Sequence, residues 1–190
     1  MTAISKFENP ISIEQHSVTP KTLPEFLEWE PEDGFKYEWN DGEIIQFNGM
    51  DKKQIYIYIL INKVFNKKGY GETGTLVCEY NTMLSGIQMR RPDIAYLSDE
   101  EGKRANDGEE IIPAFMIEII STNDNLNKVE EKITEYFKTG VKVIWNILPE
   151  QKLVYVYTSR KQVQICMDDD ICSAAPVLPE FEVKVSEIFG

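Results

Sequence analysis

The sequence predicts an α/β (α+β) protein in which helices pack against a mixed β-sheet. Residues 111–121 and 141–148 form nearly continuous apolar runs, which are typical of central strands covered on both faces. Residues 51–67 and 122–139 instead carry apolar residues at helical spacing. Because helices and strands are interspersed along one chain of 190 residues, the expected arrangement is a sheet with helices packed against it.

The individual elements follow from local signals. Alternating residues predict strands, helical spacing predicts helices, and glycine, proline and asparagine mark the turns. A capping-box spacing from Thr22 to Glu25 favours the first helix. The predicted elements, in chain order, are a short helix (22–29), a β-hairpin (35–39 and 43–47), a helix (51–67), strands (74–84 and 88–97), a charged loop (98–108), a strand (111–121), a helix (122–139) that ends at Gly140, strands (141–148, 153–157 and 162–167), and a closing strand with a helical turn (178–189).

The length suits one domain, which we expect to span residues 21–190. Residues 1–20 are polar, with scattered isoleucines and two prolines, and are expected to form a flexible N-terminal arm. The only histidine, His16, lies in this arm and is assigned no role.

Composition restricts the environment and the partners of the protein. The longest apolar run is too short to cross a membrane, and residues 1–10 lack the apolar core of a signal peptide. Three cysteines without metal-binding spacing predict free thiols in a reducing cytosol, so a cytoplasmic location is expected. The net charge of −12 opposes nonspecific binding of nucleic acid by an isolated monomer, although acidic residues also suit divalent cations.

Two acidic residues, Asp93 and Glu118, stand inside apolar runs that are predicted to form buried strands. A buried carboxylate is costly unless it pairs or binds a cation. If the strands at 88–97 and 113–121 are neighbours, the carboxylates converge, and such oxygen pairs suit Mg²⁺ or Mn²⁺. A cation there could polarise a phosphoryl oxygen and activate water. The alternative is structural: Asp93 caps a turn after Pro92, and Glu118 pairs with a helix lysine.

The helix after the second acid carries Lys128 and Lys132, one turn apart on the same face. Either ammonium could reach the carboxylates, where it could stabilise the charge of a reacting phosphate or help to activate water. The main-chain oxygen of residue 119 could complete a cation shell. Ser121 has no histidine partner for nucleophilic catalysis, so Ser121 or one of the next two residues is expected to cap the helix.

Several segments together resemble one protein family. They are Arg91-Pro92-Asp93-Ile94-Ala95, Pro113 to Ser121, Lys132 with Tyr136, Gly140-Val141 and Ile144-Trp145, with Tyr37 to Glu43 upstream and Leu178-Pro179, Phe181 and Ile188-Phe189 downstream. Through these motifs the chain resembles the Uma2 family (DUF820) over nearly its whole length. The resemblance implies a restriction-endonuclease-like fold of the PD-(D/E)XK group, with a mixed β-sheet core flanked by helices and an N-terminal hairpin extension.

The resemblance also implies roles for individual residues. Asp93 and Glu118 match the family's metal-binding acids. The lysine usually found two residues after the glutamate is absent, because Ile120 stands there, and Lys132 of the following helix is the matching position. Glu38 matches an N-terminal acidic residue that could approach the metal or steer a water. The alternative for Glu38 is a strand residue that faces solvent.

Two positions depart from the family pattern. Members often carry a histidine early in the first long helix, where this chain has Gln54. They also often carry an acidic residue four positions before the helix lysine, where this chain has Lys128. The Asp93, Glu118 and Lys132 set is nevertheless intact, which favours a working metal site.

Two hypotheses for function follow. The first is a Mg²⁺-dependent endonuclease that hydrolyses DNA phosphodiester bonds, with Asp93 and Glu118 holding the metal and Lys132 at the reacting phosphate. The second is a protein of the same fold that no longer cuts and acts as a dimeric interaction or regulatory module. The acidic net charge and the departures at Gln54 and Lys128 favour the second hypothesis. A homodimer is expected under either hypothesis.

Overall fold

The structure is a computed structural model that describes residues 19–122 and 124–190. Its centre is a six-stranded sheet in the order β10-β9-β8-β7-β6-β3. The only parallel pair in this sheet is β7 with β8, so the sheet is mixed, as expected from the sequence. The strands are β3 (Gly74–Cys78), β6 (Ile94–Ser98), β7 (Phe115–Ile119), β8 (Val143–Leu148), β9 (Leu153–Ser159) and β10 (Gln162–Cys166).

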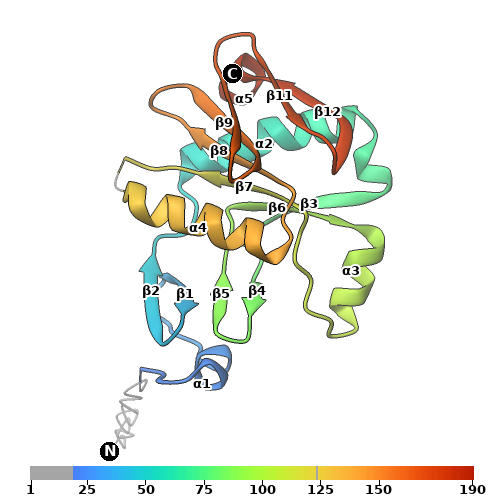
Figure 1. Ribbon diagram of the computed structural model, residues 1–190. Coiled ribbons are helices and arrows are strands. Elements are labelled where there is room, and N and C mark those ends of the chain that lie inside the picture. Colours follow the sequence, from blue (N-terminus) through green and yellow to red (C-terminus); the bar gives the residue numbers. More distant parts are fainter. Residues whose placement is uncertain (1–18, 123) are drawn as a thin grey trace, which may run out of the picture.

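Helices cover both faces of this sheet, which explains the continuous apolar runs of β7 and β8. On one face, α2 packs in the cluster that contains Ile117 and Trp145. On the opposite face, α4 packs against Met116 and Ile144. Figure 1 shows α4 crossing the sheet on this second face. The helices are α1 (Leu23–Leu27), α2 (Lys52–Lys67), the 3₁₀ turn η1 (Tyr70–Glu72), α3 (Asp99–Asn106), α4 (Leu126–Thr139) and α5 (Val185–Phe189).

A second sheet, of four strands in the order β2-β1-β5-β4, lies below the first in the view of Figure 1. The predicted hairpin is confirmed as β1 paired with β2, but it belongs to this second sheet and is not a lone extension. Helix α1 packs there through Phe26 on Trp39. The strands are β1 (Lys36–Asn40), β2 (Glu43–Phe47), β4 (Thr82–Ser85) and β5 (Gln88–Arg90).

The two long strands predicted at 74–84 and 88–97 are each broken, because the chain passes between the two sheets. The first break contains Glu79, whose φ of 51° lies in the left-handed region. The second contains Pro92, which has no N–H to donate to a ladder. The amide of Glu79 donates to the carbonyl of Asp93, 3.0 Å away, so the two breaks lie side by side. Asp93 therefore lies just before β6, at the junction of the two sheets.

Two helix predictions need correction. The segment 98–108 was expected to be a charged loop, but most of it forms α3, because Ser98 and Glu101 make a capping box and acids fill the first turn. Helix α4 begins at Leu126 and not at residue 122, because the side chain of Asn125 caps it. Ser121 therefore does not cap α4. Gly140, with φ of 108°, ends the helix as expected.

A two-stranded ribbon, β11 (Ile171–Ala174) with β12 (Leu178–Lys184), leads into α5. The sequence predicted the closing strand and helical turn but not β11. Ribbon and α5 close the α2 face, where Trp145 donates from its ring N–H to the carbonyl of Ser173 at 3.1 Å. Within the ranges that the structure describes, no helix has the length and apolar character needed to cross a membrane. The expected arm (1–20), including His16, lies outside the described residues up to residue 18.

Candidate functional site

A cleft of about 550 Å³ lies where the two sheets meet, between the hairpin β1–β2, the first turn of α2 and the first half of α4. All four residues that the sequence singled out line it. Asp93 lies just before β6, Glu118 comes from β7, Lys132 from α4 and Glu38 from β1 of the second sheet.

The two acids converge because β6 and β7 are antiparallel neighbours. Their ladder pairs Ile94 with Ile117, so the same register continued by one residue sets Asp93 opposite Glu118. Asp93 Oδ2 accepts a hydrogen bond from the amide of Ile119 at 2.6 Å, which fixes its carboxylate at the end of β7. Burial strongly raises the pKa of Asp93, and the charge of Glu118 raises it further. Two carboxylates thus share a site that is short of compensating positive charge.

Glu118 is stabilised from the α4 side. Its Oε1 accepts a hydrogen bond of 2.6 Å from the hydroxyl of Tyr136, which is fully buried. Burial raises the pKa of Glu118, the ammonium of Lys132 opposes this rise, and the charge of Glu38 adds to it. Burial and the negative charge of Glu118 also raise the pKa of Tyr136 well above its usual value, so this phenol remains a hydrogen-bond donor.

Lys132 lies between two carboxylates, with Nζ 2.9 Å from Glu38 Oε1 and 3.6 Å from Glu118 Oε1. Burial disfavours the charged ammonium, but the charges of Glu118 and Glu38 outweigh this and raise the pKa of Lys132. The ammonium therefore stays protonated at neutral pH. It can neutralise negative charge in the cleft, but it cannot accept a proton from a water.

Glu38 is 1% exposed, which excludes the solvent-facing alternative. Its Oε1 accepts from Lys132 and from the amide of Arg91, and its Oε2 accepts from Arg90 at 3.1 Å. The buried guanidinium of Arg90 also donates two hydrogen bonds, of 2.8 and 3.0 Å, to the carboxylate of Glu135. Glu38 is thus held in an ion-pair network behind Lys132.

The two positions that depart from the family pattern also lie at the cleft. Gln54 Nε2 donates to the carbonyl of Ile119 at 2.8 Å, the main-chain oxygen that could complete a cation shell. A carbonyl oxygen has two lone pairs, so this bond leaves one free. Lys128 is exposed on the rim, 3.6 Å from Glu43, and does not contact the acids. Of the two lysines, only Lys132 reaches the carboxylates.

The donor set fits a hard divalent cation. Four carboxylates gather around two cations, so the fully ionised cluster carries two uncompensated negative charges, from Glu38, Asp93, Glu118 and Glu135 against Arg90 and Lys132. Two carboxylates and a main-chain oxygen would leave the remaining positions to water, as Mg²⁺ prefers. In the described part of the chain, no three His, Cys, Asp or Glu side chains are grouped so that they alone could hold a metal.

Sequence reasoning overlooked two residues of the cleft. Asn146 of β8 is 2% exposed, and its Oδ1 has no hydrogen-bond partner among the described residues. The buried Nε of Arg91 also has no partner in that part of the chain. Asn146 interrupts the apolar run 141–148 as Glu118 interrupts 111–121, so the same signal could have identified it. In the sequence, Arg91 stood out only as the first residue of the motif that runs to Ala95, and its neighbour Arg90 is buried in ion pairs.

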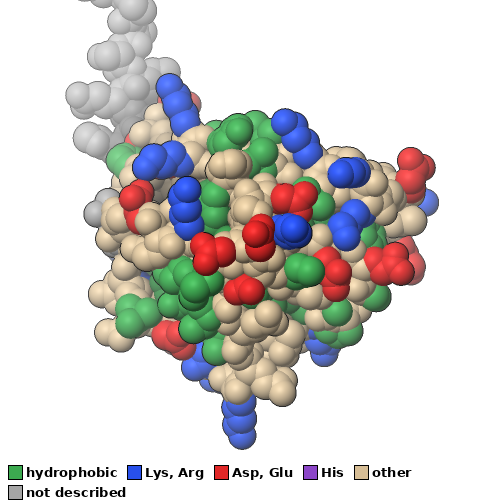
Figure 2. Space-filling view, turned by 90° about the horizontal axis from the view of Figure 1, so that it is seen from above, with side chains coloured by type: hydrophobic (Ala, Val, Ile, Leu, Met, Phe, Trp, Pro, Cys, Tyr) green, Lys and Arg blue, Asp and Glu red, His purple; other side chains and the backbone are tan. Residues whose placement is uncertain are grey.

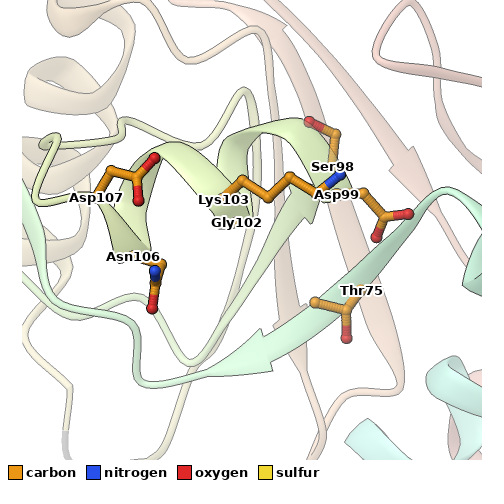
Figure 3. A pocket seen from close by; sticks show the side chains of 7 residues that line it. All are labelled: Thr75, Ser98, Asp99, Gly102, Lys103, Asn106 and Asp107. Atoms are coloured by element: carbon orange, nitrogen blue, oxygen red, sulfur yellow. The ribbon is translucent and has the colours of Figure 1, made fainter.

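A second hollow lies beside α3, away from these residues (Figure 3). Ser98, on its wall, uses its hydroxyl to cap α3 by accepting from the amide of Glu101 at 3.2 Å. The rim mixes Lys103 with Asp99 and Asp107, and none of the four predicted site residues lines it. The cleft at the sheet junction is therefore the better candidate site.

Comparisons with known proteins show the family of the chain. The chain matches the Uma2 family, described as "Putative restriction endonuclease", over residues 23–186. A solved structure from Anabaena variabilis ATCC 29413, described as a "putative nuclease belonging to DUF820", is similar with a TM-score of 0.70 and 24% identity, covering 90% of this chain and 98% of that one. A comparison with curated proteins finds no match. The family match spans most of the chain, and the chain therefore belongs to the Uma2 family.

Proposed function

We propose that the protein is an endonuclease that hydrolyses phosphodiester bonds of DNA with the help of a divalent cation, Mg²⁺ or Mn²⁺. The observation that carries this proposal is the convergence of Asp93, Glu118 and Lys132 in one cleft. Membership of the Uma2 family and the likeness to the Anabaena protein support nuclease chemistry. The proposal assigns Asp93 and Glu118 to the cation, with the carbonyl of Ile119 as a third oxygen.

Each residue of the cleft has a distinct task in this proposal. When bound, the cation polarises the phosphoryl oxygen and favours activation of water. Lys132 remains an ammonium and stabilises the negative charge that develops on the phosphate. Both oxygens of Glu38 already accept hydrogen bonds from protein groups, so the proposal assigns Glu38 to neither the cation nor the phosphate. It is a positioning residue that holds Lys132 in place.

Substrate binding must overcome the acidic character of the chain, whose net charge is −12. On the face that lies uppermost in Figure 1, basic side chains are scattered among acidic ones and form no continuous patch on the described surface (Figure 2). Within the cleft, Arg91 carries a buried Nε without a partner in the described part, and Lys128 lies on the rim. These two cations are suited to phosphates of the DNA backbone.

The test is cleavage of duplex DNA at increasing Mg²⁺ or Mn²⁺ by the protein and three variants. Asp93→Asn and Glu118→Gln should each lower the cation-dependent rate at least about 100-fold, because charge at the metal is lost. Glu100→Gln is the matched control, since Glu100 is exposed on α3 outside the cleft, and it should cut like the original protein. Full cleavage by Asp93→Asn would overturn the assignment.

The same experiment separates the second hypothesis. Two observations favour that hypothesis. Lys128, which forms an exposed pair with Glu43, stands four positions before Lys132, where family members often carry an acid, and the net charge is unfavourable for binding DNA. If the protein neither cuts DNA nor binds a cation at millimolar concentration, the proposal of a dimeric interaction module replaces that of a nuclease. Homodimerisation and a cytoplasmic location stay predictions.

A further inference from the structure

Asn146 shares a face of the sheet with Glu118. Strands β7 and β8 are parallel, and their register pairs Glu118 with Asn146 directly. Next to them, Met116 and Ile144 belong to the cluster on the α4 face, whereas Trp145 and Ile147 belong to the cluster on the α2 face. Because side chains alternate along a strand, Glu118 and Asn146 both project toward α4 and line the same cleft.

Packing alone does not account for an amide at this position. Asn146 is 2% exposed, and its Oδ1 accepts no hydrogen bond from the described residues. A buried acceptor without a partner is costly, because it loses water and gains nothing in return. Its neighbours in the cleft include Ile133 and Val129, beside which a leucine would pack without this cost. The unsatisfied oxygen therefore points to a ligand.

The chemistry of Asn146 Oδ1 limits what that ligand is. An amide oxygen only accepts hydrogen bonds. The ammonium of Lys132 is held by Glu38 and Glu118, the hydroxyl of Tyr136 donates to Glu118, and neither group donates to Asn146 Oδ1. A water in the cleft is the remaining donor, and the cleft is large enough to hold several.

We infer that Asn146 is a positioning residue of the cation site, where its Oδ1 accepts a hydrogen bond from a water that also contacts a cation held by Asp93 and Glu118. This inference rests on the cation of the proposed function. Because the amide is neutral, such a contact orients the water without adding a third negative charge beside Asp93 and Glu118, which repel each other. Residues that act on a metal through a neighbouring group commonly change metal affinity 10- to 100-fold when they are replaced.

The experiment is titration of Mn²⁺ into the full chain by calorimetry, paired with urea unfolding without metal. Asn146→Leu removes the acceptor and should weaken Mn²⁺ binding roughly 10-fold or more. Its unfolding midpoint without metal should be unchanged or higher, because the unsatisfied oxygen is gone. Asn146→Asp keeps an acceptor oxygen and should bind Mn²⁺ at least as tightly as the original protein. Asn106→Leu makes the same change on exposed α3 and is the matched control.

Each outcome decides a different point. If the original protein binds Mn²⁺ and Asn146→Leu binds it equally well, the role of Asn146 is wrong while the cation site stands. If the original protein binds no Mn²⁺ at millimolar concentration, both proposals fall. If Asn146→Leu does not fold, Asn146→Ala is measured in its place, and unchanged Mn²⁺ affinity in that variant overturns the inference.

Discussion

The Nζ atom of Lys132 lies 2.9 Å from Oε1 of Glu38. The ammonium comes from α4 on the six-stranded sheet, and the carboxylate comes from β1 of the second sheet. The orientation of Lys132 toward the acids therefore depends on how the two sheets join. Arg90, at the end of β5, anchors the same carboxylate from behind.

Replacing Glu38 by Gln should destabilise the fold and loosen Lys132. Breaking a buried ion pair typically costs about 3–5 kcal/mol, because a charge is left buried without its partner. We expect a loss of this order in the free energy of unfolding, measured by urea titration. Glu43→Gln, which removes an exposed pair with Lys128, should change it by less than about 0.5 kcal/mol. Equal effects of the two variants would contradict the network.

Replacing Tyr136 by Phe removes the hydroxyl that donates to Glu118. A buried hydrogen bond to a charged group contributes about 1.5–3 kcal/mol, so the free energy of unfolding should fall by this amount. Because this bond lowers the pKa of Glu118, its loss should also weaken Mn²⁺ binding at neutral pH. Calorimetry on Tyr136→Phe checks the second effect, and Tyr56→Phe, at an exposed site, is the control.

Replacing Asp93 by Asn should stabilise the protein when no metal is present. Burial and the charge of Glu118 raise the pKa of Asp93, so ionisation of this carboxyl destabilises the folded state. The asparagine oxygen can still accept from the amide of Ile119, while the repulsion disappears. We expect a gain on the order of 1 kcal/mol in the free energy of unfolding. Thermal unfolding with and without Mg²⁺ measures this, and a variant less stable than the original without metal would refute it.

Cys78 offers a reporter of charge near the acids. Cys78 is exposed, but the surrounding protein atoms partly desolvate its thiol and raise its pKa to about 11, with further contributions from the charges of Glu79 and Asp93. At pH 8 only about one thiol in a thousand is then a thiolate, so its reaction with a disulfide reagent should be slow and should accelerate as pH rises toward the pKa. The other cysteines, Cys166 and Cys172, are fully buried.

A cation bound at Asp93 would offset the negative charge that raises the pKa of Cys78. The reaction rate of Cys78 at pH 8 should therefore increase a few-fold with saturating Mg²⁺, on the order expected for a screened charge at this range. Asp93→Asn should show the faster rate already without metal. The same rate with and without Mg²⁺ in the original protein would contradict binding at Asp93.

Replacing Arg91 by Ala should weaken DNA binding evenly across sequences. A cation that contacts one phosphate contributes about one unit to the salt dependence of the affinity, so the slope should fall by about that amount. Fluorescence anisotropy at several salt concentrations measures the slope in the Asp93→Asn background, where cleavage is not expected to interfere. Lys63→Ala, at an exposed site on α2 outside the cleft, is the control.

Local patterns predicted much of the site. Asp93 and Glu118 stand out because each interrupts an apolar run, and the neighbouring strands bring them together as expected. The spacing of α4 placed Lys128 and Lys132 on one face, and of the two only Lys132 reaches the acids. In contrast, α3 was missed although its capping box is visible in the sequence, because its segment has no buried residue to mark a helix.

Other features depend on contacts between residues far apart in the chain. Nothing local indicates that 74–84 and 88–97 divide between two sheets, or that Arg90 joins Glu38 to Glu135 over 52 and 45 positions. The departures at Gln54 and Lys128 are visible in the sequence, but only the fold reveals that one binds the carbonyl of Ile119 and the other lies on the rim.

The sequence by itself determined the class of fold and the central strands, and it singled out Asp93 and Glu118 as candidates, because hydrophobic periodicity and a costly buried charge are local properties. Only the tertiary structure decided which partner each charged group takes. The resemblance left Glu38 either near a metal or facing solvent, yet it lies buried behind Lys132, and the polar oxygen of Asn146 lies beside Glu118 without a partner among the described residues. The reason is physical. The environment of a charged group is set by the sheets and helices that pack around it, and these come from segments far apart in the sequence.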